Sequence, residues 1–189
     1  MTGKGEKMDH RMVRTLTGCG ILIALSIILT RFASFRIPIF GVENIRIGFG
    51  PFPIILGGIL FGPILGFSIG AIADVIGFII SPMGTYMPHF TLVSGLNGLI
   101  PGLWMISSPK MINLTNSFRV RWILGVVTSQ LLNQWLLLPW FLFLTFEIPI
   151  KLSLLPRLIS APIQALVYIL FGVAIFSRQT IKTFLLSHR

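Results

Sequence analysis

Two long stretches of the chain have almost no charged residues, and they limit the fold more than any other feature. Trp122 to Phe146 contains no Asp, Glu, Lys or Arg over 25 positions, and Gly48 to Pro88 contains one, Asp74, over 41 positions. The whole chain is 54% hydrophobic and 11% charged, whereas soluble domains average about 25% charged residues. Runs of this kind predict transmembrane helices. We therefore expect an all-α integral membrane protein with a single domain.

Six transmembrane helices are expected from the apolar runs. The 41-residue stretch is too long for one crossing, and Gly62-Pro63 is the expected break between its two helices. Several runs are shorter than the roughly 20 residues that a perpendicular helix needs, so some ends are expected to be tucked inside the bundle. No A-x-A-like site follows the first run, so it is not interpreted as a cleaved signal peptide. The predicted spans are approximately residues 13–30, 48–62, 63–80, 89–106, 122–146 and 158–176.

The basic residues are divided unequally between the two sides of this bundle. Six spans place both termini on one side, and that side carries ten of the 15 Lys and Arg residues. Because Lys and Arg are enriched in cytoplasmic loops, both termini are expected to be cytoplasmic. The same rule explains the net charge of +10 without a nucleic-acid partner. The sequence also lacks the G-x-x-x-x-G-K-[ST], H-E-x-x-H and G-x-S-x-G motifs of ATPases and hydrolases.

Three of the five basic residues on the opposite side, Arg31, Arg36 and Arg46, follow the first span in one loop. One interpretation is a short loop that is simply solvated. The other is capture of an anionic solute, because a guanidinium group binds a carboxylate through two parallel hydrogen bonds.

Polar side chains within four predicted spans fall at a similar depth. At about 1.5 Å per residue, they lie roughly 10–16 Å below the outer ends of their helices. Each one alone is explained by helix–helix contact, but a shared depth predicts a cavity open to the outside. These residues are Asp74, Asn97, Gln130, Asn133 and Gln164.

Aromatic residues, including Tyr86, Phe90 and Trp140, surround this level. They are either interface anchors or the walls of a site for a flat heterocyclic ligand. His89 is expected to cap or line the loop before the fourth span, and no metal site or cofactor is expected, because no second ligand has suitable spacing. Asp74 is the only acid in any predicted span. It either fixes helix packing or accepts two N–H groups from a ligand.

Small residues lie on the first span, where Gly20 and Ala24 are four positions apart. A small-x-x-x-small face allows close helix approach. It is consistent with packing inside the bundle or with docking to another membrane subunit.

The segment "RIGFGPFPIILGGILFGPILGFSIGAIADVIGFIISPMGTYMPHFTLVSGLNGLIPG" carries the most specific motifs: Arg-x-Gly-Phe, Leu-Phe-Gly-Pro, Gly-x-x-Ala-Asp-x-x-Gly, Gly-x-Tyr-x-Pro and Phe-Thr-Leu. Through them the chain resembles the substrate-binding S components of energy-coupling factor (ECF) vitamin transporters, specifically the folate type. The similarity extends from the first span to the sixth. His89 is a departure, since a Gly is expected at that position.

The resemblance implies a six-helix protein of the bacterial plasma membrane that is not itself an enzyme and binds folate from outside. It implies partners: a transmembrane coupling subunit, which Gly20 and Ala24 would contact, and two ATPase subunits. An S component for another vitamin, riboflavin or thiamine, stays open, as does a membrane scaffold that transports nothing. The arginine-rich first loop favours a dianionic tail such as the glutamate of folate.

Overall fold

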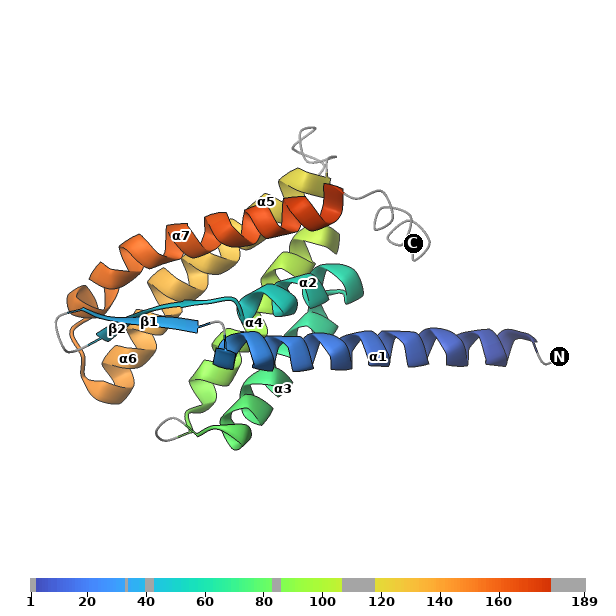
Figure 1. Cartoon of the computed structure of the whole chain (residues 1–189), viewed down its shortest axis with the longest axis horizontal. Helices are drawn as coiled ribbons and strands as arrows, with labels where there is room; N and C mark the ends of the chain where they lie inside the picture. The colour runs from blue at the N-terminus through green and yellow to red at the C-terminus, as the bar shows by residue number, and fades with distance from the viewer. Residues whose placement is uncertain (1–2, 33, 40–42, 83–85, 107–117, 178–189) are drawn as a thin grey trace.

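In the computed structural model, the helices follow one another in the order that the apolar runs predict (Figure 1). The structure describes residues 3–32, 34–39, 43–82, 86–106 and 118–177, and it describes side chains for residues 10–32, 48–82, 86–106 and 119–175. The elements are α1 (Gly3–Phe32), β1 (Ser34–Ile39), β2 (Glu43–Gly48), α2 (Pro51–Phe61), α3 (Pro63–Ile80), α4 (Pro88–Ile106), α5 (Phe118–Gln130), η2 (Leu131–Leu137), α6 (Leu138–Phe146) and α7 (Ile150–Ser177). The prediction of a helical membrane protein is confirmed.

The all-α prediction assumed an irregular loop after the first helix, but this loop contains two β-strands. Strands β1 and β2 pair as an antiparallel hairpin, in which Arg36 is the register partner of Arg46. The hairpin lies at the end of the bundle where α1 ends and α7 begins, on the left in Figure 1. We call this the hairpin end. Its final residue is held in place by α7, because the buried Tyr168 hydroxyl donates to the carbonyl oxygen of Gly48 at 2.5 Å.

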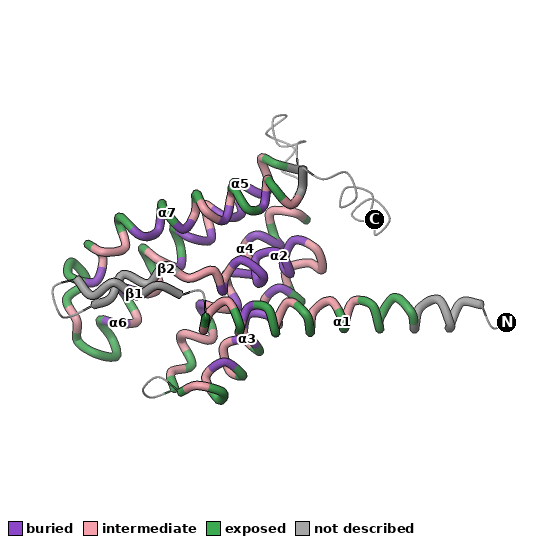
Figure 2. The backbone as a smooth tube through the Cα atoms, viewed as in Figure 1, coloured by how far each residue is buried: buried purple, intermediate pink, exposed green. Residues whose placement is uncertain are grey.

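The expected helix break at Gly62-Pro63 is present, between α2 and α3. Gly62 has φ = 98°, a conformation that favours glycine, and Pro63 opens α3. Helix α2, with 11 residues, is buried from Phe52 to Ile59. At about 1.5 Å per residue it is shorter than a bilayer core of about 30 Å. This central position agrees with the expectation that short helices are tucked into the bundle (Figure 2).

The fifth predicted span is one continuous rod but not one α-helix. Residues Leu131–Leu137 form a π-helix between α5 and α6. Pro139 has no N–H to offer, so the carbonyl of Trp135 loses its α-helical partner. The wider turn provides other pairings, and the Leu138 amide donates to the Asn133 carbonyl. π-Helical turns are rare and often occur at functional sites.

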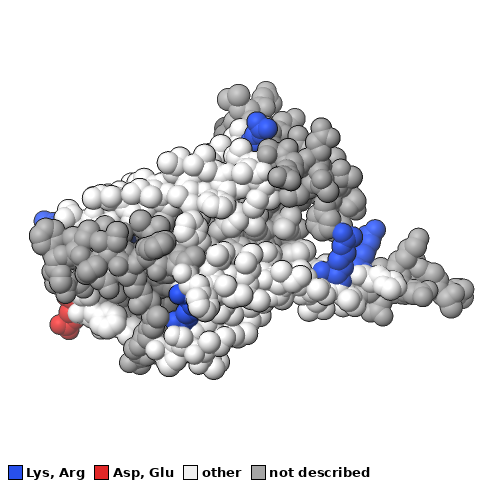
Figure 3. All heavy atoms as spheres, viewed as in Figure 1, with Lys and Arg blue, Asp and Glu red and all other residues white. Residues whose placement is uncertain are grey.

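The outer surface of the bundle is apolar, as a bilayer requires. Three described helical segments are long and apolar enough to cross a membrane: His10–Phe32, Pro63–Ile80 and Ile150–Ile175. Large hydrophobic side chains on them are exposed, including Leu16, Ile64 and Leu155. Figure 3 shows only a few charged side chains on the visible face, separated by broad uncharged surface.

Candidate functional site

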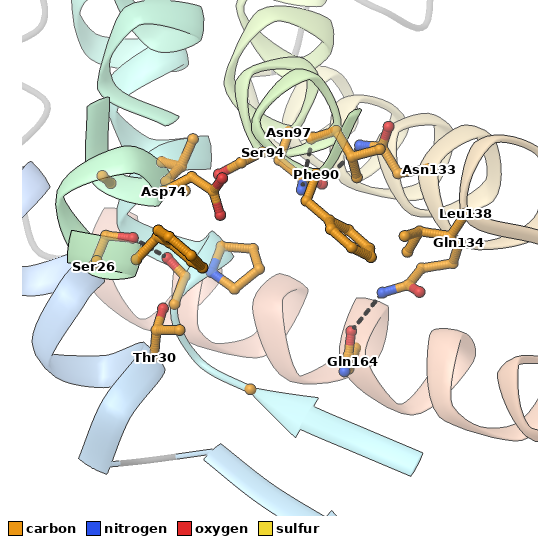
Figure 4. A pocket seen from close by; sticks show the side chains of 18 of the residues that line it. Ser26, Thr30, Asp74, Phe90, Ser94, Asn97, Asn133, Gln134, Leu138 and Gln164 are labelled. Atoms are coloured by element: carbon orange, nitrogen blue, oxygen red, sulfur yellow. Dashed lines mark hydrogen bonds between the residues drawn. The ribbon is translucent and has the colours of Figure 1, made fainter. Parts of the chain in front are cut away.

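A cavity of about 530 Å³ opens between helices from both halves of the chain. Its walls come from α1, α2, α3, α4, η2, α6 and α7, and from the turn after β2. Small-molecule sites in proteins typically have volumes of about 300–1,000 Å³. Figure 4 shows Asp74 on one side of this space, Phe90 reaching into it from α4, and the pair Gln134 and Gln164 on another side.

The carboxylate of Asp74 is held by a short chain of hydroxyl groups. Thr91 Oγ1 donates to Asp74 Oδ2 at 2.6 Å. Since this bond uses the Thr91 proton, the Tyr86 hydroxyl, 2.9 Å from Thr91 Oγ1, must be the donor in the second bond. The chain fixes one oxygen of Asp74 on the cavity wall. Thr91 belongs to the Phe-Thr-Leu motif of the sequence but was not predicted as a site residue, because a Thr near a helix start has many structural uses.

Arg31, near the end of α1, also lines the cavity and contacts α3 at Gly77, about one helical turn after Asp74. Its Nη2 donates to the carbonyl oxygen of Gly77, where a positive charge is favoured by the C-terminal end of the helix. Among the described residues its buried Nε has no hydrogen-bond partner. The side chains of the other two predicted loop arginines, Arg36 and Arg46, lie outside the described residues.

Two of the predicted intramembrane amides meet in the cavity wall. Asn133 Nδ2 donates to Asn97 Oδ1 at 2.8 Å, and Ser129 Oγ donates to the same oxygen at 3.2 Å. Asn97 Nδ2 donates to the Val93 carbonyl oxygen at 3.2 Å, which fixes the orientation of its amide. Gln130 is buried beside this cluster but does not line the cavity.

A second pair of amide side chains links η2 to α7 in the cavity wall. Gln134 Nε2 donates to Gln164 Oε1 at 3.2 Å, and both side chains are on the cavity wall (Figure 4). The π-helix therefore supplies two consecutive cavity residues, Asn133 and Gln134.

Aromatic side chains form part of the wall, though not all those predicted. Phe78, Tyr86 and Phe90 line the cavity. His89 does not line it; it stacks on Phe141 of α6, with ring centroids 5.0 Å apart, and lies 4.5 Å from Phe90. It thereby ties the start of α4 to α6 behind the wall. Trp140 is 57% exposed and is also absent from the wall.

The two small residues of α1 point away from the bundle. Gly20 and Ala24 are exposed, and a Cβ atom built on Gly20 would meet nothing within 4 Å. By contrast, a Cβ on Gly18 would lie 2.6 Å from the Phe61 ring. Of the two interpretations of this face, internal packing suits Gly18 and an outer contact suits Gly20 and Ala24.

Further cavity residues were not predicted from the sequence. They include a second arginine, Arg157, together with Ser26, Thr30, Ser94, Gln134 and Ser160. Arg157 is one of the five basic residues predicted on the side opposite the termini, and no site role was predicted for it. Two signals existed at α7: Pro156 beside it and Ser153 four residues earlier, which its guanidinium group contacts. No group of three His, Cys, Asp or Glu side chains suited to a metal occurs in the described part of the chain.

An apolar helical exterior around a ligand-sized cavity with several polar side chains on its wall is the arrangement expected of a membrane protein that binds small solutes. The chain belongs to the ECF-type S component family: the family model described as "ECF-type riboflavin transporter, S component" matches residues 10–181. This family consists of transporter components, and membership confirms the resemblance found in the sequence.

Several known proteins are similar to this chain. The folate transporter FolT of Clostridium novyi (strain NT) is 33% identical over 161 residues, covering 83% of this chain and 87% of that protein. A UPF0397 protein of Streptococcus thermophilus is 35% identical over 97 residues, 51% of each chain. A crystal structure of FolT bound with folic acid aligns with a TM-score of 0.67 and 27% identity, over 83% of this chain and 89% of that one. The family description thus names riboflavin, while the relative and the solved structure that each cover 83% of this chain are folate proteins.

Proposed function

We propose that this protein is the folate-binding S component of an ATP-driven ECF transporter in the bacterial plasma membrane. In this proposal it binds folate from outside and works with a transmembrane coupling subunit and two ATPase subunits, which hydrolyse ATP. The chain would cross the membrane six times, with both termini in the cytoplasm, and would need no cofactor. The name of the C. novyi relative and the folic-acid complex of FolT support this choice of vitamin.

The observation that carries the proposal is the position of Asp74. Its carboxylate lies on the cavity wall with one oxygen fixed by Thr91. The pterin ring of folate presents an amino group and an adjacent ring N–H along one edge, and a carboxylate can accept both in parallel. Hydrogen bonds to a charged group contribute about 1.5–3 kcal/mol each. Phe78 and Phe90 line the same cavity and offer faces against which the ring can stack.

The same carboxylate argues against riboflavin, which the family description names. The polar edge of a flavin carries one ring N–H between two carbonyl oxygens. A carboxylate facing that edge would meet two acceptors at close range, and such unpaired contacts discriminate strongly between ligands. Riboflavin is nevertheless the second candidate, because the family model matches almost the whole chain.

The arrangement of the helices supports the proposed topology and coupling. Helix α1 begins and α7 ends toward the end of the bundle opposite the hairpin (Figure 1). The described arginines Arg11, Arg14, Arg119 and Arg121 lie in the terminal parts of α1 and α5, and basic residues of this kind favour the cytoplasmic side. The exposed Gly20 and Ala24 offer a close-approach surface for the coupling subunit.

The test is a titration of the purified wild-type protein with folate, riboflavin and thiamine. None of the four tryptophans lines the cavity, so calorimetry or equilibrium dialysis suits this protein better than tryptophan fluorescence. We expect saturable binding of one folate per chain and no saturation by the other two vitamins at the same concentrations. Tighter binding of riboflavin would make riboflavin, and not folate, the substrate. If none of these vitamins binds, the proposal that the protein is a vitamin-binding component is wrong.

A further inference from the structure

Thr91, in the Phe-Thr-Leu motif, reaches the cavity through Asp74 rather than by itself. Among the described residues, its neighbour Phe90 lines the cavity and Thr91 does not. Thr91 belongs to α4 and Asp74 to α3, and the bond from Thr91 Oγ1 to Asp74 Oδ2 measures 2.6 Å. This is the length of a strong hydrogen bond from a hydroxyl group to a carboxylate. An effect of Thr91 on a bound ligand would therefore pass through the Asp74 carboxylate.

The bond from Thr91 leaves most of the Asp74 carboxylate available to a ligand. Within the part of the chain that the structure describes, Asp74 Oδ1 has no hydrogen-bond partner. Because the group turns only about its Cβ–Cγ bond, holding Oδ2 also sets the position of Oδ1. A carboxylate has about four lone-pair positions, so Oδ2 can accept a second bond. Figure 4 shows Asp74 and Phe90 on facing sides of the cavity.

The hydroxyl group of Thr91 is itself held in one orientation. Its single proton goes to Asp74, so the Tyr86 hydroxyl, 2.9 Å away, donates to Thr91 Oγ1. The Tyr86 ring contacts the ring of Phe78 on α3, with centroids 5.2 Å apart. Hydrogen bonds in such a chain polarise and strengthen one another. A different direction of the Thr91 proton would break the bond to Asp74.

A purely structural role would be to tie α4 to α3, but other contacts already do this. Ser94, about one helical turn after Thr91, donates to the carbonyl oxygen of Gly70 on α3 at 2.9 Å. A Cβ built on Gly70 would collide with the Ser94 backbone, so the two helices are closely packed there. The Ser94 bond ends on the backbone of α3, whereas the Thr91 bond ends on a side chain of the cavity wall. This difference separates the two roles.

We propose that Thr91 is a positioning residue for ligand recognition, which acts by holding both oxygens of Asp74 in line with one edge of the ligand ring. Tyr86 supports it by fixing the direction of the Thr91 hydroxyl. The identity of the ligand rests on the proposed function, in which this edge is the amino group and ring N–H of the pterin. Thr91 thereby determines the preference for a ring edge with two donors over an edge with one.

A pair of ligands tests this assignment. Folate is compared with its 2-oxo analogue, in which a carbonyl oxygen replaces the 2-amino group, so that the edge offers one N–H between two carbonyl oxygens. For the wild-type protein we expect folate to bind at least tenfold more tightly, measured by equilibrium dialysis. Thr91→Val keeps the size of the side chain without its hydroxyl. The preference should then fall to less than one third of the wild-type value, because a carboxylate that can turn offers a single oxygen to either ligand.

Ser94→Ala is the matched control, since it removes the other bond between α4 and α3. It should affect both ligands by a similar factor and leave the preference for folate unchanged. Thr91→Ser, which keeps the hydroxyl, should retain the preference, and Tyr86→Phe should lower it by less than Thr91→Val does. In an Asp74→Asn background, Thr91→Val should change the preference no further, because the residue that it positions is already altered.

A wild-type preference retained in Thr91→Val, or an equal fall in Ser94→Ala, would overturn the assignment. If Thr91→Val does not fold, an unchanged preference in Tyr86→Phe would overturn it as well. These outcomes leave folate binding by the wild-type protein in place. Absence of wild-type folate binding would instead contradict the proposed function, and this inference with it.

Discussion

The helices α2, α3 and α4 meet along a glycine seam, whereas η2 and α7 form a polar wall, and the two regions are built on opposite principles. In the seam, which we define as Gly58, Gly66, Gly98 and Gly102, backbone touches backbone. A Cβ on Gly58 would lie 1.9 Å from the Gly98 carbonyl oxygen, and one on Gly98 would lie 2.2 Å from that of Gly66. No side chain fits there, so the helices have one closely packed arrangement.

The polar wall, defined as η2 with the Ser153–Gln164 part of α7, is irregular. It contains a π-helix before Pro139 and two prolines inside α7, Pro156 and Pro162. Its contacts are side-chain hydrogen bonds, such as Gln134 with Gln164. The comparison suggests a division of labour: the seam determines whether the bundle assembles, and the wall, together with Asp74 of α3, determines what the cavity binds.

Adding one methyl group to the seam should have the largest effect. In Gly98→Ala the new Cβ would meet the Gly66 backbone, which cannot move as a flexible side chain can. Overpacking of this kind costs about 1–3 kcal/mol and sometimes more. We expect a large fall in melting temperature or failure to purify as a monodisperse protein, measured by differential scanning fluorimetry and gel filtration. An unchanged melting temperature would show that the seam is not rigid.

A glycine outside the seam should behave differently. Gly20 on α1 has open space around it, so Gly20→Trp should leave the melting temperature and folate binding unchanged. If the coupling subunit packs on this face, the bulky side chain should abolish folate uptake by cells that carry the complete transporter. Ile21→Trp, at an exposed neighbouring position, should retain uptake and serves as the control. Loss of binding in Gly20→Trp would place this face inside the bundle.

A change in the polar wall should affect binding and spare the fold. Gln134→Leu removes the bond to Gln164, and one such hydrogen bond contributes about 0.5–1.5 kcal/mol. The expected result is a two- to tenfold loss of folate affinity, measured by calorimetry, with a small change in melting temperature. A large loss of stability with normal binding would reverse the roles assigned to the two regions.

The sequence predicted the site and the fold best at residue types that occur in few structural settings. An acid in an apolar run must meet polar groups, and the structure places Asp74, Asn97, Asn133 and Gln164 on one cavity. The Gly62-Pro63 break was equally predictable, since few other sequences interrupt a helix as strongly.

Other features of the fold and the site were not predicted, either because they depend on tertiary contacts or because a pattern in the sequence was interpreted differently. The alternation in "SFRIPI" and "ENIRIG" is typical of strands, but the basic residues drew the interpretation toward a charged loop. The π-helix was not predicted, because a Pro such as Pro139 inside an apolar run more often kinks or ends an α-helix. The place of Arg157 on the cavity wall depends on the direction of its side chain, and Ser153 is one of the residues that hold it. Trp140 was predicted to line the site but does not, because an aromatic residue near a span end can equally lie on the outer surface.

The most direct test of the proposed function is the binding of folate, and of 6-hydroxymethylpterin without the tail, to Asp74→Asn. The substitution keeps the shape of the side chain but replaces one acceptor with a donor. If Asp74 accepts the two N–H groups of the pterin ring, the variant should fold normally and bind both ligands at least tenfold more weakly, a loss of about 1.4 kcal/mol or more. Unchanged affinity for the pterin, or a variant that does not fold, would contradict the ligand role and leave Asp74 as a structural residue.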